Sequence, residues 1–431
     1  MLTFAIFGTL LIFLLLNIPV FTALGLSAVI FLVCSGGIQF LAMLPHRMYY
    51  GTTGFTLLAI PFFIFAGNLM NRGGITARIF AFAKALTGHI PGGLGQVNIM
   101  ASIIFSGMSG SAVADAAGLG QIEHKAMVDD GYEPAVSASL VAASSVIGPI
   151  IPPSIPFVLY GAITGVSVAR LFIAGFLPGI VLGIGMMIAL AVMAKIYHYP
   201  SAPHMERISV IWAAFRRAFW ALMAPVIIIG GIMSGFFTPT EASVVVTFYA
   251  LILGFAYKDL KVKDLPGIIT STINQASGLL FIMAAANFFG WLILYRKLPD
   301  NIIQSLTGFG LTQNAVQWII IGIVLIMGCF LEGNAIFMIT LPIFMPIITM
   351  FNINVINFGV VMTLLIMIGN LTPPVGMCLF AVDSFAKVGV IKLGKKILPY
   401  LVVILIVTII IAFAPEITLY LPNKIMGGGG G

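Results

Sequence analysis

The sequence predicts an all-α polytopic membrane protein, on the strength of its composition, its long uncharged stretches and a repeated Pro-Pro motif. Of its 431 residues, 60% are hydrophobic and 8% are charged, which excludes an ordinary soluble globular domain. No Asp, Glu, Lys or Arg occurs in residues 1–46, 265–295 or 333–382. Each stretch exceeds the roughly 20 residues that cross a hydrocarbon core about 30 Å thick. The chain therefore belongs in a lipid bilayer.

Helices are the expected form of these stretches, because backbone amides in lipid must be satisfied within the protein. The stretches lack the alternation of apolar and polar residues that a transmembrane barrel needs. Residues 2–16 have neither a basic n-region nor a small-residue cleavage site, so we expect a retained first span and not a signal peptide.

Two basic linkers, residues 195–217 and 258–264, indicate the cytoplasmic side. The segment 218–257 between them is long enough for two spans with a turn near 238–241, which returns the chain to the same side. A last apolar run, 397–415, then places the C-terminus outside. Acidic residues contribute little to orientation, so the side of residues 115–133 stays open.

The net charge of +7 is explained by topology, because Lys and Arg lie between the spans and form no basic face for nucleic acid. Cys34, Cys329 and Cys378 lie in apolar stretches, and we expect neither a disulfide nor a metal site from them. The terminal glycines, 427–431, are expected to be an artificial remnant.

An internal repeat organises the chain. Residues 148–154 (GPIIPPS) recur as 369–375 (GNLTPPV), an offset of 221 residues. Residues 105–108 match 326–329 at the same offset, and Asn68 matches Asn287 at an offset of 219. Repeats within a transporter usually form two related units with the binding site between them. We predict one half over residues 1–217 and a second over 218–426.

The paired prolines predict a break in each of two helices, near 148–154 and near 369–376. A proline within a helix costs about 3 kcal/mol or more, because it removes an amide donor and clashes with the preceding turn. A break at membrane depth is tolerated where it is buried in protein or lines a polar cavity. Its freed carbonyl oxygens suit sodium. The alternative is a pair of kinks used only for packing.

Other polar groups stand out against the apolar background. The small, hydroxylated segment 106–111 precedes the first break, although Ser and Gly also serve close helix packing. Glu332 and Asp383 bound the uncharged stretch 333–382. An ionisable group near the bilayer interior is usually functional or paired, but either residue could instead reach an interface. Residues 389–396 have the spacing of a phosphate loop without its Ser or Thr, so ATP is not expected.

These motifs resemble the large membrane subunit of the tripartite ATP-independent periplasmic (TRAP) transporters over nearly the whole chain. The most specific segments are 106–111 with Ala114-Asp115, 148–153, 238–242, 328–332 and 372–376.

The resemblance implies two inverted repeats with re-entrant helical hairpins and an elevator-type movement of a transport domain against a scaffold. It implies a multi-pass protein of the bacterial inner membrane, a small four-helix membrane subunit as partner and a soluble periplasmic binding protein that delivers the substrate.

The resemblance also implies residue roles. The first sodium site would use Ser106, Ser109, Gly148, Ile151 and Pro153, and the second would use Gly328, Gly369, Thr372 and Val375. Met327 stands where the second repeat would match Ser106, so the two sites differ chemically. Glu332 occupies a position where Asp is commoner in the family. The substrate is expected near Ser111, Ser154, Glu332 and Asp383.

The function expected from the sequence is sodium-coupled import of a small organic anion, such as sialic acid, a C4-dicarboxylate or a keto acid. Helix N-termini, which carry partial positive charge, would favour its carboxylate. The alternatives are an ion channel and a sodium-coupled anion transporter that acts without a binding protein. An intramembrane enzyme is disfavoured, because no arrangement of nucleophile and base is evident.

Overall fold

The computed structural model describes residues 2–16, 18–202 and 204–427, with side chains at all of these except 2–5, 107 and 109. The described residues form helices joined by short connections, with no strand among them. Among the described residues, six helical segments are long and apolar enough to cross a membrane, and a bent pair at 390–413 raises this to as many as seven. The prediction of an all-α polytopic membrane protein is confirmed.

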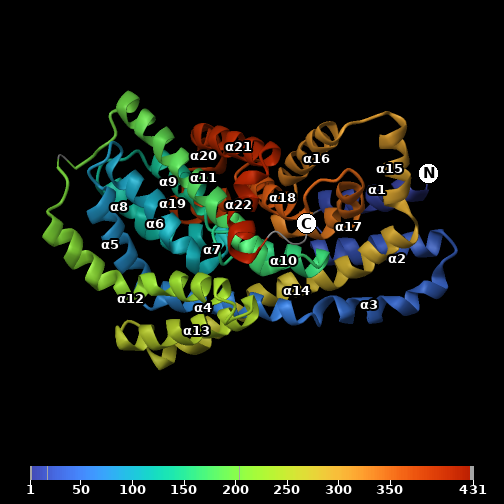
Figure 1. Ribbon diagram of the computed structural model, residues 1–431, viewed down its shortest axis with the longest axis horizontal. Helices are drawn as coiled ribbons and strands as arrows, with labels where there is room; N and C mark the ends of the chain where they lie inside the picture. The colour runs from blue at the N-terminus through green and yellow to red at the C-terminus, as the bar shows by residue number, and fades with distance from the viewer. Residues whose placement is uncertain (1, 17, 203, 428–431) are drawn as a thin grey trace.

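One layer of the molecule, which we call the frame, includes the helices that run along the lower edge of Figure 1. Within it α13 packs on α4, α14 packs on α2, α3 and α4, and α12 packs on α5. Three short 3-10 helices connect frame elements at Ile38–Ala42, Phe55–Leu58 and Val262–Asp264. The frame consists of α1 (Leu2–Leu15), α2 (Val20–Cys34), α3 (Met43–Thr52), α4 (Ala59–Arg72), α5 (Ile75–Thr87), α12 (Ile208–Met233), α13 (Pro239–Ala256) and α14 (Leu265–Tyr295).

The turn between α12 and α13 has a local cause. Thr238 is the N-cap of α13: its Oγ1 accepts a hydrogen bond from the backbone N–H of Glu241 at 3.3 Å. The Glu241 carboxylate in turn accepts from the backbone N–H of Thr238 at 2.8 Å. Such a reciprocal capping box satisfies two donors at the helix start. The prediction of two helices within 218–257 and a turn near 238–241 is confirmed, although α12 begins earlier, at Ile208.

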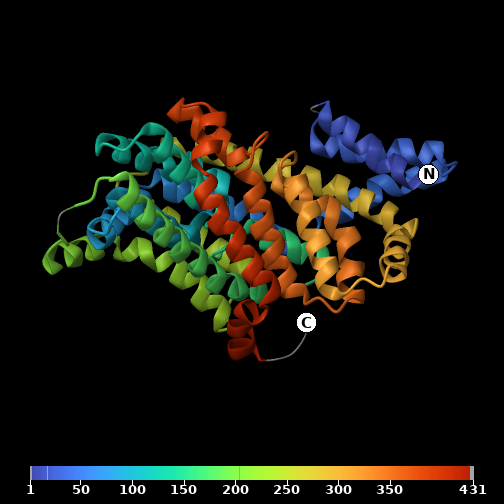
Figure 2. The same ribbon diagram turned by 90° about the horizontal axis from the view of Figure 1, so that it is seen from above.

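The remaining helices form a central body. In Figure 2, green and red helices lie side by side across the middle of the molecule, where α11 contacts α21 and α22. The body consists of α6 (Gly93–Ser109), α7 (Ala112–Ala117), α8 (Leu119–Asp129), α9 (Pro134–Ser145), α10 (Ile155–Thr164), α11 (Val168–Tyr197), α15 (Leu298–Gly308), α16 (Gln313–Gly328), α17 (Gly333–Met350), α18 (Val355–Asn370), α19 (Met377–Ala386), α20 (Val390–Lys396), α21 (Leu398–Phe413) and α22 (Glu416–Met426).

Helices α9 and α18 occupy the centre of this body. Residues 135–145 of α9 and residues 356–370 of α18 are all buried. A helix surrounded by protein on every side needs no polar face, which explains why both sequences consist mostly of apolar or small residues. Beyond its break, each chain segment crosses to the other half: α10 packs on α17 and α18, and α19 packs on α7 and α9.

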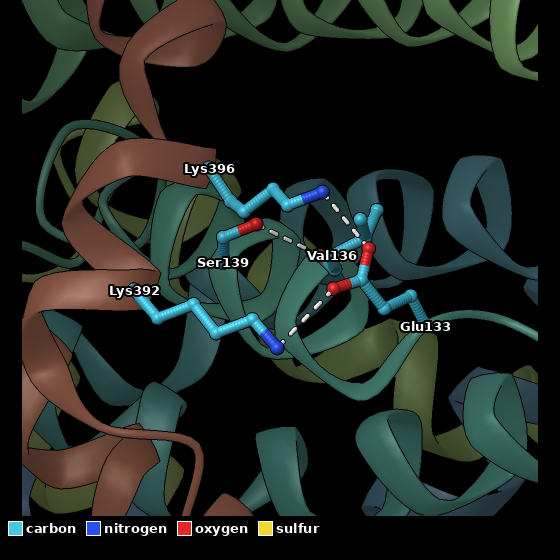
Figure 3. A network of polar contacts seen from close by, with 5 residues as sticks. All are labelled: Glu133, Val136, Ser139, Lys392 and Lys396. Atoms are coloured by element: carbon cyan, nitrogen blue, oxygen red, sulfur yellow. Dashed lines mark hydrogen bonds and ion pairs between the residues drawn. The ribbon is translucent and has the colours of Figure 1, made fainter.

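An exposed ion-pair network ties α9 to α20, as Figure 3 shows. Glu133, which directly precedes α9, lies 2.8 Å from the Nζ of Lys396 and 3.5 Å from the Nζ of Lys392. The hydrogen bond from Lys396 lowers the pKa of the Glu133 carboxyl group. The basic residues after the second break thus hold the start of the first broken helix.

Candidate functional site

The first helix break lies where the prolines predicted it. Helix α9 ends at Ser145 and α10 begins at Ile155. Ser154 caps α10: its Oγ accepts from the Phe157 N–H at 3.2 Å and donates to the Pro149 carbonyl oxygen. The Ile155 N–H reaches across to the Gly110 carbonyl oxygen at 3.3 Å. The break is thereby fastened to the turn between α6 and α7.

The second break repeats this arrangement. Helix α18 ends at Asn370 and α19 begins at Met377. The Val375 N–H donates to the Cys329 carbonyl oxygen at 3.2 Å, which fastens this break to the turn between α16 and α17. Thr372 Oγ1 donates to the Ile368 carbonyl oxygen at 2.7 Å. The predicted breaks at both Pro-Pro motifs are confirmed.

Each break therefore faces the turn of a helical hairpin: α6 with α7–α8 for the first, and α16–α17 for the second. Gly110, at the first turn, has φ +64, and a Cβ there would lie 2.7 Å from the Pro153 carbonyl oxygen. Only glycine combines this left-handed backbone with so close an approach. The hairpin turn and the broken helix consequently meet backbone to backbone.

At the second site, Gly328 and Gly369 are in direct backbone contact. A Cβ on Gly328 would lie 2.9 Å from the Gly369 Cα, and a Cβ on Gly369 would lie 2.8 Å from the Gly328 carbonyl oxygen. The structure thus brings together four residues of the predicted second sodium site: Gly328 and Gly369 by this contact, Thr372 by its N–H bond to the Gly369 carbonyl oxygen, and Val375 by its bond to Cys329.

The first predicted sodium site has a different chemistry. Ser106 is fully buried, and its hydroxyl donates to the Ile103 carbonyl oxygen at 2.6 Å. The side chain of Ser109 lies outside the described residues. A Cβ on Gly148 would collide with the carboxylate of the buried Asp115, which therefore lies beside the break. The sequence assigns Ile151 and Pro153 to this site, and it places Asp115 in a specific segment without giving it a role in the site.

A cavity of about 840 Å³ lies between the frame and the two hairpin turns. Of the residues predicted to contact substrate, Ser111 and Glu332 line this cavity. The Glu332 carboxylate caps α17 by accepting from the Ala335 N–H at 3.1 Å, and it also accepts from the Asn334 side-chain amide at 2.5 Å. The cavity joins the start of α7 to the start of α17.

The structure does not bring the other two predicted substrate residues to this cavity. Ser154 is fully buried as the cap of α10. The Asp383 carboxylate accepts hydrogen bonds from the Val388 N–H at 2.9 Å and the Gly389 N–H at 2.7 Å, and so holds the turn after α19. In both residues the polar atoms satisfy nearby backbone groups.

Sequence reasoning missed several neutral polar residues of the cavity. One of them, Asn68, was found only as a member of the internal repeat, and its repeat partner Asn287 lines a different cavity. Side-chain amides carry no charge to mark them in an apolar sequence. The polar cavity residues to which the sequence analysis assigned no role in binding are Asn68, Asn71, Gln275, Asn334 and Asn370.

Comparison with known families gives one match over almost the whole chain. Residues 7–417 match the family described as "Tripartite ATP-independent periplasmic transporter, DctM component".

Two relatives are similar to the chain at 41% identity. The sialic acid TRAP transporter large permease protein SiaM of Vibrio cholerae aligns over 96% of both chains. The sialic acid TRAP transporter permease protein SiaT of Haemophilus influenzae aligns over 88% of this chain, which spans 62% of the length of that relative.

Among solved structures, the YdaH transporter of Alcanivorax borkumensis is similar in fold. Its TM-score is 0.65 over 91% of both chains, at 15% sequence identity. At this identity the similarity concerns the fold alone.

Proposed function

Because the chain belongs to the DctM component family of the tripartite ATP-independent periplasmic transporters, we propose that it imports a small organic anion across the bacterial inner membrane together with sodium. As a permease of that family it is a multi-pass transport protein. The coupling ion, the substrate and the partners named below are parts of the proposal.

One observation carries the sodium proposal: each Pro-Pro break is hydrogen-bonded through its backbone to a hairpin turn, Ile155 to Gly110 and Val375 to Cys329. At both places the helical pairing of backbone groups is interrupted, and we propose that the carbonyl oxygens released there face the ion. Such oxygens are the ligands that sodium takes at broken transporter helices. Ser106 and Thr372 would each add a hydroxyl oxygen.

Asp115 strengthens the first site, because its buried carboxyl group lies close to Gly148. Carboxyl oxygens are among the ligands that hard cations take. We propose that an oxygen of Asp115 joins the ligands of a sodium ion in the first site, while the second site relies on backbone and hydroxyl oxygens.

The substrate is proposed to occupy the cavity between the two hairpin turns. Sialic acid is the first candidate, because the two relatives described above are named for it. C4-dicarboxylates and keto acids are the comparison substrates. The Glu332 carboxylate lines this cavity while it caps α17, and it is proposed to accept hydrogen bonds from hydroxyl groups of the substrate.

The proposed movement is an elevator in which the central body carries the cavity past the frame. The two predicted halves, 1–217 and 218–426, supply the same order of parts: a hairpin, a broken helix and a further long helix. This common order supports two inverted repeats. A small membrane subunit is proposed to bind this chain, and a periplasmic binding protein is proposed to deliver the substrate, without ATP.

The energetics allow this coupling. Each positive charge that enters down a potential of 100 mV supplies about 2.3 kcal/mol. A tenfold gradient of the anion costs about 1.4 kcal/mol, so two sodium ions would offset it together with the cost of one negative charge moving inward.

The test is uptake of radiolabelled sialic acid into proteoliposomes that contain the chain with its small subunit, with the binding protein supplied outside. We expect saturable uptake that requires an inward sodium gradient and that potassium cannot replace. Uptake that rises linearly with concentration would favour the channel alternative. Equal uptake without the binding protein would favour a transporter that acts alone.

A further inference from the structure

A second cavity of about 850 Å³ lies between the frame and the central body, separate from the cavity at the hairpin turns. Helix α14 passes both: residues 275–282 line the first cavity and residues 283–294 line the second. Because α14 begins directly after the basic linker 258–264, its later residues lie toward the outer side of the membrane. We call this second space the outer cavity.

A guanidinium group faces the outer cavity. Arg47, on α3, lines it, and the buried Nε of this side chain has no hydrogen-bond partner in the described structure. The guanidinium carbon lies 5.3 Å from the centre of the Trp291 ring, within the range of a cation–π interaction. Since Nε itself is closed off from solvent, the two Nη groups are the donors that a ligand in the outer cavity can reach.

The remaining polar residues of the outer cavity narrow the chemical class of ligand that it can bind. The two Nη groups form a planar fork that matches the two oxygens of a carboxylate. Asn287, on α14, lines the same cavity and offers both a donor and an acceptor. Asp300, on α15, also lines it; its carboxylate would accept hydrogen bonds from hydroxyl groups and would repel a second anionic group.

From this arrangement we infer that the outer cavity is a second binding site, which holds a hydroxylated monocarboxylate by Arg47 before it reaches the cavity at the hairpin turns. The inference rests on the proposed function, since it places a waiting site on the route of the same anion. It also predicts which anions the outer cavity binds: a monocarboxylate with hydroxyl groups is favoured over a dicarboxylate.

The test is protection of a cysteine from a membrane-impermeant maleimide in lipid nanodiscs. Thr56 lines the outer cavity and becomes the reporter as Thr56→Cys, in a background with Cys34→Ala and Cys329→Ala. Sialic acid is the first probe and succinate the second. We expect sialic acid to slow labelling several-fold, and succinate to slow it much less.

Variants of Arg47 test whether this residue binds the anion in the outer cavity. Arg47→Gln should raise the concentration of sialic acid needed for half-protection by about tenfold or more, because the carboxylate loses a bidentate charged partner. Arg47→Lys should restore only part of the protection, because lysine is a point charge without the planar fork. Full protection in Arg47→Gln would overturn the site.

Two controls distinguish binding in the outer cavity from binding elsewhere. Asn334→Ala alters the cavity at the hairpin turns, and loss of protection there would mean that sialic acid acts from that cavity, which overturns the proposal. A labelling rate that follows the anionic lipid content of the nanodisc, and not sialic acid, would assign Arg47 to a lipid headgroup and would also overturn it.

Uptake by the Thr56→Cys parent, measured in proteoliposomes with the partners supplied, keeps this inference distinct from the proposed function. Sodium-driven uptake without protection of the cysteine would overturn the outer site alone. Protection without sodium-driven uptake would support the outer site and remove sodium-coupled import.

Discussion

Gly328 and Gly369 pack backbone against backbone. A Cβ atom added to Gly328 would lie only 2.9 Å from the Cα of Gly369. One glycine ends α16 at the second hairpin turn, and the other lies in the last turn of α18, just before the second break. Their contact sets how closely the hairpin turn approaches the break.

Gly328→Ala should therefore move the proposed ligands of the second sodium site apart. Overpacking of a tight contact costs about 1–3 kcal/mol, and a shift of a few tenths of an ångström separates cation ligands. We expect a higher sodium concentration for half-maximal uptake and a lower melting temperature in nanodiscs. Gly322→Ala, on the same helix, is the matched control, because a Cβ there meets no atom within 4 Å. Equal effects of the two variants would contradict the contact argument.

Thr372→Ala tests the hydroxyl ligand proposed for the second site. The Thr372 hydroxyl donates to the carbonyl four residues earlier, so its oxygen can still accept a cation. Its loss should raise the half-maximal sodium concentration by about tenfold, as the loss of an interaction with a charged group of about 1.5 kcal/mol implies.

The matched control for Thr372 is Thr363→Ala. Thr363 lies on α18, the helix that ends just before Thr372, and it is fully buried. Like the Thr372 hydroxyl, its hydroxyl donates to the carbonyl oxygen four residues earlier, that of Gly359, at 2.9 Å. Ser106→Ala is the corresponding change at the first site. Sodium titrations that coincide for Thr372→Ala and Thr363→Ala would remove Thr372 from the site.

Glu332→Gln separates the two roles of Glu332. Glutamine keeps an oxygen that can accept from the Ala335 N–H, so the cap of α17 should survive with little change in melting temperature. Loss of the charge in the cavity should weaken the apparent affinity for sialic acid about fivefold, since hydrogen bonds to charged groups are the stronger ones. Kinetics of uptake at saturating sodium measure this effect.

Asp383→Asn is the comparison for Glu332, because Asp383 caps a turn and does not line the cavity among the described residues. It should lower the melting temperature and leave the KM for sialic acid unchanged. A raised KM in this variant would place Asp383 on the substrate route after all.

Glu133→Gln tests the link between α9 and α20. The hydrogen bond from Lys396 holds the pKa of Glu133 below the ordinary value of a glutamate, so the ionised form is favoured in the folded state. The stabilisation is present above the unfolded pKa and is lost as the pH falls through the folded pKa. The Glu133 side chain is 44% exposed, so the network contributes less than about 1 kcal/mol.

Melting temperatures of the parent and of Glu133→Gln should therefore differ slightly at neutral pH and converge as the solution is acidified below about pH 4. Glu206→Gln, in the exposed linker before α12, is the control, because Glu206 takes part in none of the ion pairs found in the described part of the chain. A difference between the parent and Glu133→Gln that persists at low pH would have to come from packing.

The positions of the two breaks follow from the sequence alone. A Pro-Pro pair interrupts a helix through its own ring and its missing amide donor, whatever surrounds it. The same holds for the capped turn at Thr238, where donor and acceptor are three residues apart. These features are local, and local chemistry needs no knowledge of distant partners.

Contacts between distant segments were decided only by the tertiary structure. Asp115 stands beside Gly148, Arg47 faces the outer cavity over Trp291, and Asp383 turns to its own loop instead of the cavity. Each outcome depends on how frame and central body pack, because apolar helices of nearly uniform composition carry little signal of which polar side chain meets which. The sequence by itself determined where the helices break; packing determined what faces each break.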